Sequence, residues 1–167
     1  MLEREADRVE GEVLVSADTA VAQAAAAAGV ERIFFLSHLG ADRASAFAVL
    51  KAKAIAEEYI RRSQVDYTIL RSAILYGQED HFTTGLGRLL AASPFVFLVP
   101  QDGRMLLQPL WVEDLVTCLA WALHDDSTRN QTYSIGGPEY LSFNQVLGSV
   151  MEATGIQRTP VHVGMPY

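Results

Sequence analysis

The sequence predicts an α/β fold with a mainly parallel sheet and flanking helices. Short apolar runs typical of buried strands alternate with segments of helical spacing along the whole chain. Half of the 167 residues are hydrophobic, which is enough apolar material for a buried core. No internal repeat and no linker divides the chain, so we expect one domain over residues 1–167.

The first predicted elements are a helix and a strand. Asp18 is a predicted helix cap, the alanine block at 24–28 is a strong helix signal, and Gly29 supplies the left-handed residue that ends the helix. The run at 32–37 is nearly continuous in β-branched and aromatic residues. A strand of this kind is typical of a parallel sheet, so we expect it to be buried on both faces.

The next segment completes a βαβ unit. Residues 45–62 have helical spacing, with apolar positions separated by polar ones that include Glu57 and Glu58, and Glu58 forms a predicted i,i+4 pair with Arg62. A second strand is predicted at 67–70. The helix between the two strands has the length of a right-handed crossover.

The second half of the chain has shorter predicted elements. In order, they are a helix at 82–92, a strand at 95–99, a turn at 101–104, a strand at 105–107, a helix capped by Glu113 or Asp114 that ends at His124, and a strand at 133–135. Ser142 and Gln145 form a predicted capping box for a last helix that Gly155 ends. Little structure is expected after this helix.

Charge and cysteine content exclude several classes of function. Thirteen Lys and Arg against twenty Asp and Glu give a net charge of −7, and the basic residues are scattered, so neither nucleic acid nor a membrane surface is an expected partner. Cys118 is the only cysteine and the four histidines are scattered, which predicts no disulfide and no metal site. The first ten residues have no export signal, so we expect a cytoplasmic protein.

Several segments, taken in order, are similar to those of one family. They are GVERIFFLSHLGA at 29–41, the helix that carries Lys51, DYTILR at 66–71 followed by Tyr76-Gly77, QPLWVED at 108–114 and YSIGGP at 133–138. These segments resemble the atypical short-chain dehydrogenases/reductases, the NmrA-like and NAD-dependent epimerase/dehydratase-like group. The resemblance covers most of the chain from residue 17 onward.

The resemblance implies a Rossmann-like domain that binds NAD or NADP, with residues 78–167 contributing the substrate-side region. In the family a Tyr acts as general acid or base, a Lys holds the cofactor ribose, and a Ser orients the substrate carbonyl. The Ser position falls on Ser37 and the Lys position on Lys51, but Phe47 stands four residues before Lys51, where the family has its Tyr. Phenylalanine cannot transfer a proton, so impaired or absent catalysis is implied.

Other site residues follow from the same resemblance. Histidine is a residue type that serves as an acid in many enzymes, so His38, beside Ser37, is a candidate acid, and Tyr76 is another candidate. The family has a proline after its Leu-Arg pair, whereas this chain has Ser72. Cofactor contacts are therefore expected from Ser72 and from the backbone of Ala73 and Ile74.

The front of the chain departs from the family pattern. The family places Gly-x-x-Gly-x-x-Gly after its first strand, where the glycines approach the cofactor pyrophosphate, and this sequence has no such motif. Fewer than 40 residues precede Ser37, and one βαβ unit takes about 30 or more, so we expect a Rossmann-like fold shortened at its N-terminal end.

This departure predicts an exposed strand edge. The strand at 32–37 lacks its preceding neighbour unless residues 13–15 supply a short one, and an exposed apolar edge favours pairing with another chain. We therefore expect a homo-oligomer, or assembly onto a partner protein through this edge.

Each candidate residue has a structural alternative. Ser37 is equally consistent with a hydrogen bond to its own loop, Lys51 with a solvated helix lysine, and His38 with a loop histidine, while Arg71 is expected to pair with a carboxylate. Two functions stay open: an NAD(P)-dependent oxidoreductase or sugar-nucleotide epimerase relative, and a non-catalytic interaction or regulatory module.

Overall fold

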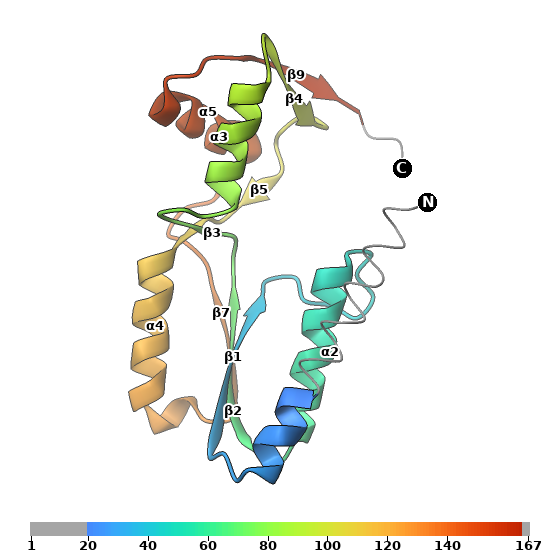
Figure 1. The fold of residues 1–167 in the computed structure, drawn as a ribbon, viewed down its shortest axis with the longest axis vertical. Helices are drawn as coiled ribbons and strands as arrows, with labels where there is room; N and C mark the ends of the chain where they lie inside the picture. The colour runs from blue at the N-terminus through green and yellow to red at the C-terminus, as the bar shows by residue number, and fades with distance from the viewer. Residues whose placement is uncertain (1–19, 165–167) are drawn as a thin grey trace. The chain divides into compact units, whose positions relative to one another are not determined.

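The computed structural model describes residues 20–164, which form two compact units (Figure 1). Unit 1 consists of the described part of Met1–Ser72 together with Val116–Ile135, and unit 2 consists of Ala73–Leu115 and the described part of Gly136–Tyr167. The predicted cap Asp18 and the predicted short strand at 13–15 lie outside the described residues. Within residues 20–164, no helix has the length and apolarity that crossing a bilayer requires.

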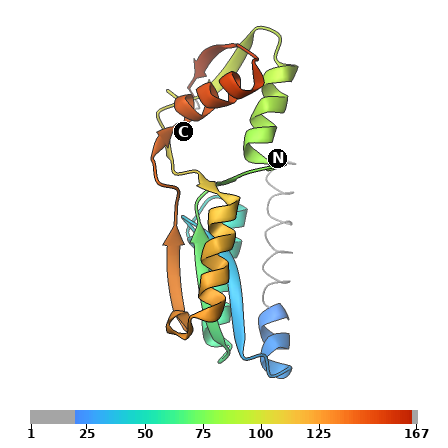
Figure 2. The same ribbon diagram turned by 90° about the vertical axis from the view of Figure 1, so that its left-hand side faces the viewer.

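Unit 1 is a parallel three-stranded sheet with helices on both faces. Its elements are a helical segment at 20–27, β1 (Arg32–His38), α2 (Ala48–Arg62), β2 (Asp66–Ser72), most of α4 (Val112–His124) and β7 (Gln131–Ile135). The strand order is β1-β2-β7, and Ser37 is in register with Arg71. Figures 1 and 2 show the 20–27 segment and α2 on one face of this sheet and α4 on the other.

A small apolar core joins the helices of unit 1 to its sheet. Ala22, Ile60 and Ile69 are buried together, and Ile33 and Phe35 of β1 pack against them. Because side chains alternate along a strand, the residues two positions apart on β1 and β2 face α2. This alternation directs Ser37 and Arg71 toward α2 as well.

The predicted βαβ unit is confirmed with small differences. Gly29 has a φ of +68°, as its predicted role requires, and α2 begins at Ala48 rather than at residue 45. The prediction that strand 32–37 is buried on both faces is wrong, because Leu36 is 38% exposed and only Ser37 of this strand is buried. Among the described residues β1 pairs with β2 alone, so it is an end strand, and β2 occupies the buried central position.

Unit 2 contains two helices and three pairs of short strands. The pairs are β3 (Leu75–Tyr76) with β6 (Leu110–Trp111), β4 (Val96–Pro100) with β9 (Thr159–Val163), and β5 (Leu106–Leu107) with β8 (Leu141–Ser142). The first two pairs are parallel and the third is antiparallel. The helices α3 (Phe82–Ala92) and α5 (Phe143–Thr154) pack on β4 around a core that includes Leu90, Val99 and Leu147.

The elements of unit 2 confirm some predictions and correct others. The capping box of Ser142 and Gln145 and the left-handed Gly155 are confirmed. The predicted cap at Glu113 or Asp114 is wrong, because strand pairing continues to Trp111 and α4 begins directly after it. The prediction of little structure after the last helix is also wrong, because the strand β9 follows this helix and pairs with β4.

Candidate functional site

Ser37 lies near the end of β1, and its hydroxyl is occupied within the protein. Its side chain is buried, and its Oγ donates a hydrogen bond of 2.6 Å to Oε1 of Glu57, a residue of α2. Glu57 is itself fully buried. The Ser37 hydroxyl hydrogen therefore points into the protein and does not face an external carbonyl group.

Glu57 is the buried centre of a charge cluster that we call the Glu57 cluster, which consists of Glu57, Ser37 and the partly exposed Arg61 and Arg71. Arg71 donates to both carboxylate oxygens, at 2.9 Å from Nε and 2.6 Å from Nη2, and Arg61 donates from Nη2 at 2.8 Å. Burial raises the pKa of Glu57, but the hydrogen bonds from Arg71, Ser37 and Arg61 together outweigh it and hold the pKa below its ordinary value. The carboxylate is therefore ionised and structural.

Sequence reasoning missed Glu57 and found only one of its partners. From its spacing alone, the residue belongs to the polar face of the helix together with Glu58, which does form its predicted pair with Arg62. The expectation that Arg71 pairs with a carboxylate is confirmed. The available signal was Arg71 itself, since an arginine on an otherwise apolar central strand requires a counter-charge on the covering helix.

His38 and Ser72 meet across the carboxyl ends of β1 and β2. They are in register, and the Ser72 hydroxyl donates to the backbone carbonyl of Ser37 at 3.4 Å. The His38 ring places Nδ1 2.5 Å from the carbonyl oxygen of Leu39, in its own loop. The Leu39 amide in turn donates to the Ser72 carbonyl at 2.8 Å, so this end of the sheet is tied together by local hydrogen bonds.

Lys51 and Phe47 lie at the start of α2, four residues apart and therefore on one face of the helix. Phe47 is the N-cap residue, and 72% of its surface is exposed. Lys51 is exposed as well, and within residues 20–164 its ammonium group has no ion pair or hydrogen bond. This pair therefore offers an unengaged cation beside an exposed aromatic ring.

The other predicted cofactor contacts belong to unit 2. Ala73 is buried directly after β2, and the Ile74 carbonyl accepts a hydrogen bond of 2.9 Å from the Leu110 amide. Tyr76 packs its ring on Trp111 with centroids 5.2 Å apart. The cofactor role of Ser72, Ala73 and Ile74 stays a prediction.

The donors of unit 1 fit part of a nicotinamide dinucleotide. The Lys51 ammonium group suits ribose hydroxyls, which need a donor that is not already used. The Ser37 hydroxyl does not suit a substrate carbonyl, because Glu57 already takes its hydrogen. Within residues 20–164, no group of His, Cys, Asp or Glu is arranged to hold a metal ion.

Comparison with curated proteins gives relatives whose names describe subunits of NADH dehydrogenase. The NADH dehydrogenase (ubiquinone) 1 alpha subcomplex subunit 9, mitochondrial, of Rattus norvegicus is 33% identical over 138 residues, which cover 81% of this chain and 36% of that protein. The protein of the same name from Arabidopsis thaliana is 30% identical over 140 residues, which cover 83% of this chain and 34% of that protein. The chain thus spans about a third of the length of these relatives.

Comparison with solved structures gives the fold. The dTDP-glucose 4,6-dehydratase DesIV of Streptomyces venezuelae with NAD bound superposes with a TM-score of 0.77 at 20% identity, covering 95% of this chain and 55% of that one. The UDP-glucose 4-epimerase of Thermus thermophilus with NAD superposes with a TM-score of 0.68 at 22% identity, covering 86% and 54%. The prediction of a Rossmann-like fold with epimerase and dehydratase neighbours is confirmed.

The sequence also matches a family description, which is NAD(P)H-binding, over residues 6–95. This match includes β1, α2, β2 and α3, and with them Ser37, Phe47 and Lys51. It confirms the predicted cofactor class, NAD or NADP. Because the match covers more than half of the 167 residues, the chain belongs to the NAD(P)H-binding family.

Proposed function

We propose that unit 1 binds NAD(P) at the start of α2 and does not perform the reductase chemistry of related short-chain dehydrogenases. The observation that carries the proposal is the pair formed by Phe47 and Lys51. Lys51 is an exposed, unengaged cation within the described chain, and Phe47 stands where a proton-transferring tyrosine is expected. Lys51 can therefore bind the cofactor, whereas Phe47 cannot transfer the proton that the reductase reaction requires.

The residues of this site divide the work as follows. The Lys51 ammonium group donates to the ribose hydroxyls of the cofactor, and the exposed Phe47 ring covers an apolar face of the ligand. A bound NAD(P)H supplies hydride chemistry, but Phe47 has no titratable hydroxyl to move a proton. Ser37 donates to Glu57 and so does not orient a carbonyl.

Calorimetry of the full chain with NAD, NADH, NADP and NADPH tests the binding part. We expect one of the four to bind, and Lys51→Ala to weaken that binding about tenfold, which is about 1.4 kcal/mol. Lys53→Ala is the matched control, because the Lys53 ammonium lies 4.7 Å from the Phe35 ring centroid and is already engaged. Binding of none of the four, or equal losses in both variants, would contradict the proposal.

An activity assay tests the absence of catalysis. We expect the wild-type chain to oxidise neither NADH nor NADPH in the presence of a panel of aldehydes and ketones. Turnover that Lys51→Ala abolishes would show that the site is catalytic in spite of Phe47. The Phe47→Tyr variant extends the test, because a gain of turnover in this variant alone identifies the proton-transferring group as the missing part.

A second candidate function is assembly with another chain through the free edge of β1. Within the described residues β1 pairs only with β2, and its Leu36 is 38% exposed. The names of the curated relatives describe subunits of a larger enzyme, and those names include the word mitochondrial. We propose that the β1 edge joins a second copy of this chain or a partner protein; the predicted cytoplasmic location stays a prediction.

Light scattering at micromolar concentration tests the self-association form of this candidate. We expect a mass of at least twice 18.3 kDa, and a shift to the monomer mass in Leu36→Lys, because a charge on an edge strand opposes strand pairing. Val30→Lys is the control, since Val30 is exposed to a similar degree but precedes the strand. A wild-type monomer would exclude the second copy as the occupant of this edge.

A further inference from the structure

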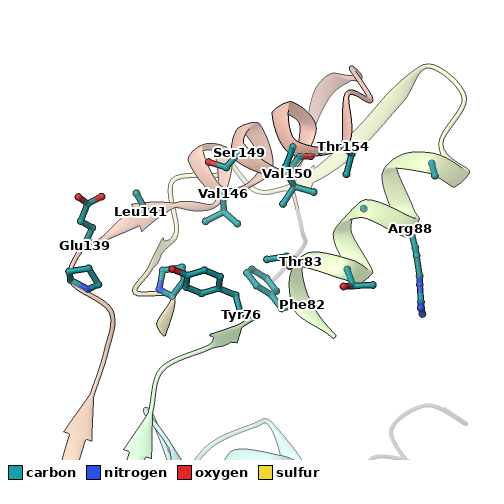
Figure 3. Close-up of a pocket in the computed structure, with 16 residues that line it drawn as sticks. Tyr76, Phe82, Thr83, Arg88, Glu139, Leu141, Val146, Ser149, Val150 and Thr154 are labelled. Carbon is teal, nitrogen blue, oxygen red and sulfur yellow. Dashed lines mark hydrogen bonds between the residues drawn. The ribbon is translucent and has the colours of Figure 1, made fainter. Parts of the chain in front are cut away.

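Unit 2 contains a cavity that shares no residue with the NAD(P) site proposed above. Its volume is about 760 Å³, and it lies between α3 and α5. Figure 3 shows Val146 and Val150 of α5 directed toward the rings of Tyr76 and Phe82, which form the opposite wall. The volume is within the range of about 300–1,000 Å³ that small-molecule sites occupy.

Most of the hydroxyl groups around this cavity are already engaged. Thr83 donates its hydroxyl hydrogen to the carboxylate of Asp80, at the start of α3. Ser149 and Thr154 donate to backbone carbonyl groups one turn earlier on α5, at 3.2 and 2.7 Å. Few of these hydroxyl groups are therefore free to donate a hydrogen bond to a ligand, so the lining of the cavity is mainly apolar.

The charged residues of the lining lie at its margins. Arg88 and Glu139 are the two charged residues among the sixteen that line the cavity, and both are exposed. Figure 3 shows them at opposite ends of the lining, with the Arg88 guanidinium directed away from the other residues. A diphosphate needs several cations or free amide groups around it, so this interior does not suit a nucleotide.

Besides Thr84, Tyr76 supplies the remaining hydroxyl group of the lining. Its ring is held by Trp111, with an interplanar angle of 57° between the two rings. Within residues 20–164, its hydroxyl has no hydrogen bond. A fixed aromatic ring with a free hydroxyl can pack against an apolar ligand and contact one polar atom of it.

We propose that this cavity binds one neutral, mainly apolar small molecule that carries a single hydrogen-bonding group, and that the Tyr76 hydroxyl contacts this group. The engaged hydroxyls and the outward-directed charges select against sugar nucleotides and other anions. The site goes beyond the NAD(P) site in both position and ligand chemistry.

Fluorescence titration of the full chain with N-phenyl-1-naphthylamine, a neutral aromatic amine, tests this proposal. We expect saturable binding at one site per chain and at least a tenfold loss of affinity in Gly87→Leu. Gly87 lines the cavity, and a Cβ atom there would lie 3.6 Å from Cγ2 of Thr154, so a leucine would extend into the space. Gly85→Leu is the matched control, because a Cβ atom at Gly85 on the same helix meets nothing within 4 Å.

Further variants keep the test decisive. If Gly87→Leu does not fold, Ala153→Leu replaces it, since Ala153 lines the cavity from an exposed position on α5. Tyr76→Phe is expected to weaken the amine severalfold and to leave naphthalene binding unchanged, because only the amine has a group for the hydroxyl to contact.

Three results would overturn the proposal: no saturable binding, equal losses in Gly85→Leu and Gly87→Leu, or competitive displacement of the amine by UDP-glucose. The NAD(P) titration of the Lys51 variants is a separate measurement on unit 1. Failure of one proposal therefore leaves the other standing.

Discussion

Gly137 has no room for a side chain because another part of the backbone lies against it. A Cβ atom built at this position would lie 1.8 Å from the carbonyl oxygen of Pro109. Gln108 holds the two segments together, since its Nε2 donates to the Gly137 carbonyl at 2.7 Å and its own carbonyl accepts from the Gly137 amide at 3.3 Å. The GGP segment of the sequence is therefore a close backbone contact within unit 2.

We expect Gly137→Ala to lower the free energy of unfolding by about 2–3 kcal/mol, because backbone atoms must move to admit the methyl group. Urea unfolding followed by circular dichroism measures the change. Gly148→Ala is the control: a Cβ atom there meets nothing within 4 Å, so this helix position should gain about 0.5–1 kcal/mol. Equal stability of Gly137→Ala and wild type would show that the contact is not tight in solution.

At the scale of elements, α5 has the most completely specified ends of the helices described. The Ser142 hydroxyl accepts a hydrogen bond from the Gln145 amide at 3.2 Å, and the Gln145 side chain accepts one from the Ser142 amide at 2.8 Å. Gly155 ends the helix with a φ of +70°. Each end of α5 is fixed by residues within one turn of it. The same helix forms one wall of the cavity described above.

Ser142→Ala should cost about 1 kcal/mol of stability, because the Gln145 amide at the start of α5 loses the hydroxyl oxygen that accepts its hydrogen bond. Ser149→Ala is the matched control within the same helix. Its hydroxyl donates only to a carbonyl group one turn earlier, and alanine has the higher helix propensity, so no loss is expected. Thermal unfolding of both variants distinguishes a capping effect from a general effect of removing a hydroxyl group.

At the scale of the whole molecule, the Glu57 cluster links the covering helix of unit 1 to two strands of its sheet. Glu57 comes from α2, Ser37 from β1 and Arg71 from β2, so one carboxylate connects three elements. Its pKa lies below the ordinary value of 4.5 because hydrogen bonds from Arg71, Ser37 and Arg61 outweigh the opposing effect of burial. The unfolded chain therefore binds a proton at Glu57 more readily than the folded chain does.

This difference predicts a loss of stability in acid. The contribution of Glu57 is fully present above pH 4.5, the pKa of the unfolded state, and is lost as the pH falls from there through the lower folded pKa. Urea unfolding at pH values from 7 to 3 should follow this course. Glu57→Gln should lose about 1–2 kcal/mol near neutral pH and show a weaker acid dependence, because two partly exposed arginines lose their shared carboxylate.

Glu58→Gln is the control for this experiment. The Glu58 side chain is partly exposed and pairs with Arg43 and Arg62, whose side chains are 66% and 74% exposed. Exposed pairs of this kind contribute less than about 1 kcal/mol. Equal acid profiles for the two variants would show that the Glu57 cluster is not the source of the pH dependence.

Predictions from sequence succeeded where the physical signal is local. The helix at 82–92 and the capping box at Ser142 were found because their signals lie within a few residues. The strand β9 was missed because its five exposed residues have no alternating pattern, and it forms only by pairing with β4, about 60 positions earlier. The start of α4 was misplaced because the pairing of Trp111 with Tyr76 sets it.

The sequence by itself determined the family, the cofactor class and the order of most strands and helices, because these depend on residue types and on spacing along the chain. Only the tertiary structure decided which of the candidate site residues are free to meet a ligand. Glu57 lies 20 positions from Ser37 and meets it only when α2 packs on the sheet. In that packing the Ser37 hydroxyl donates its hydrogen bond to Glu57 inside the protein. Lys51, one turn from the start of the same helix, stays exposed.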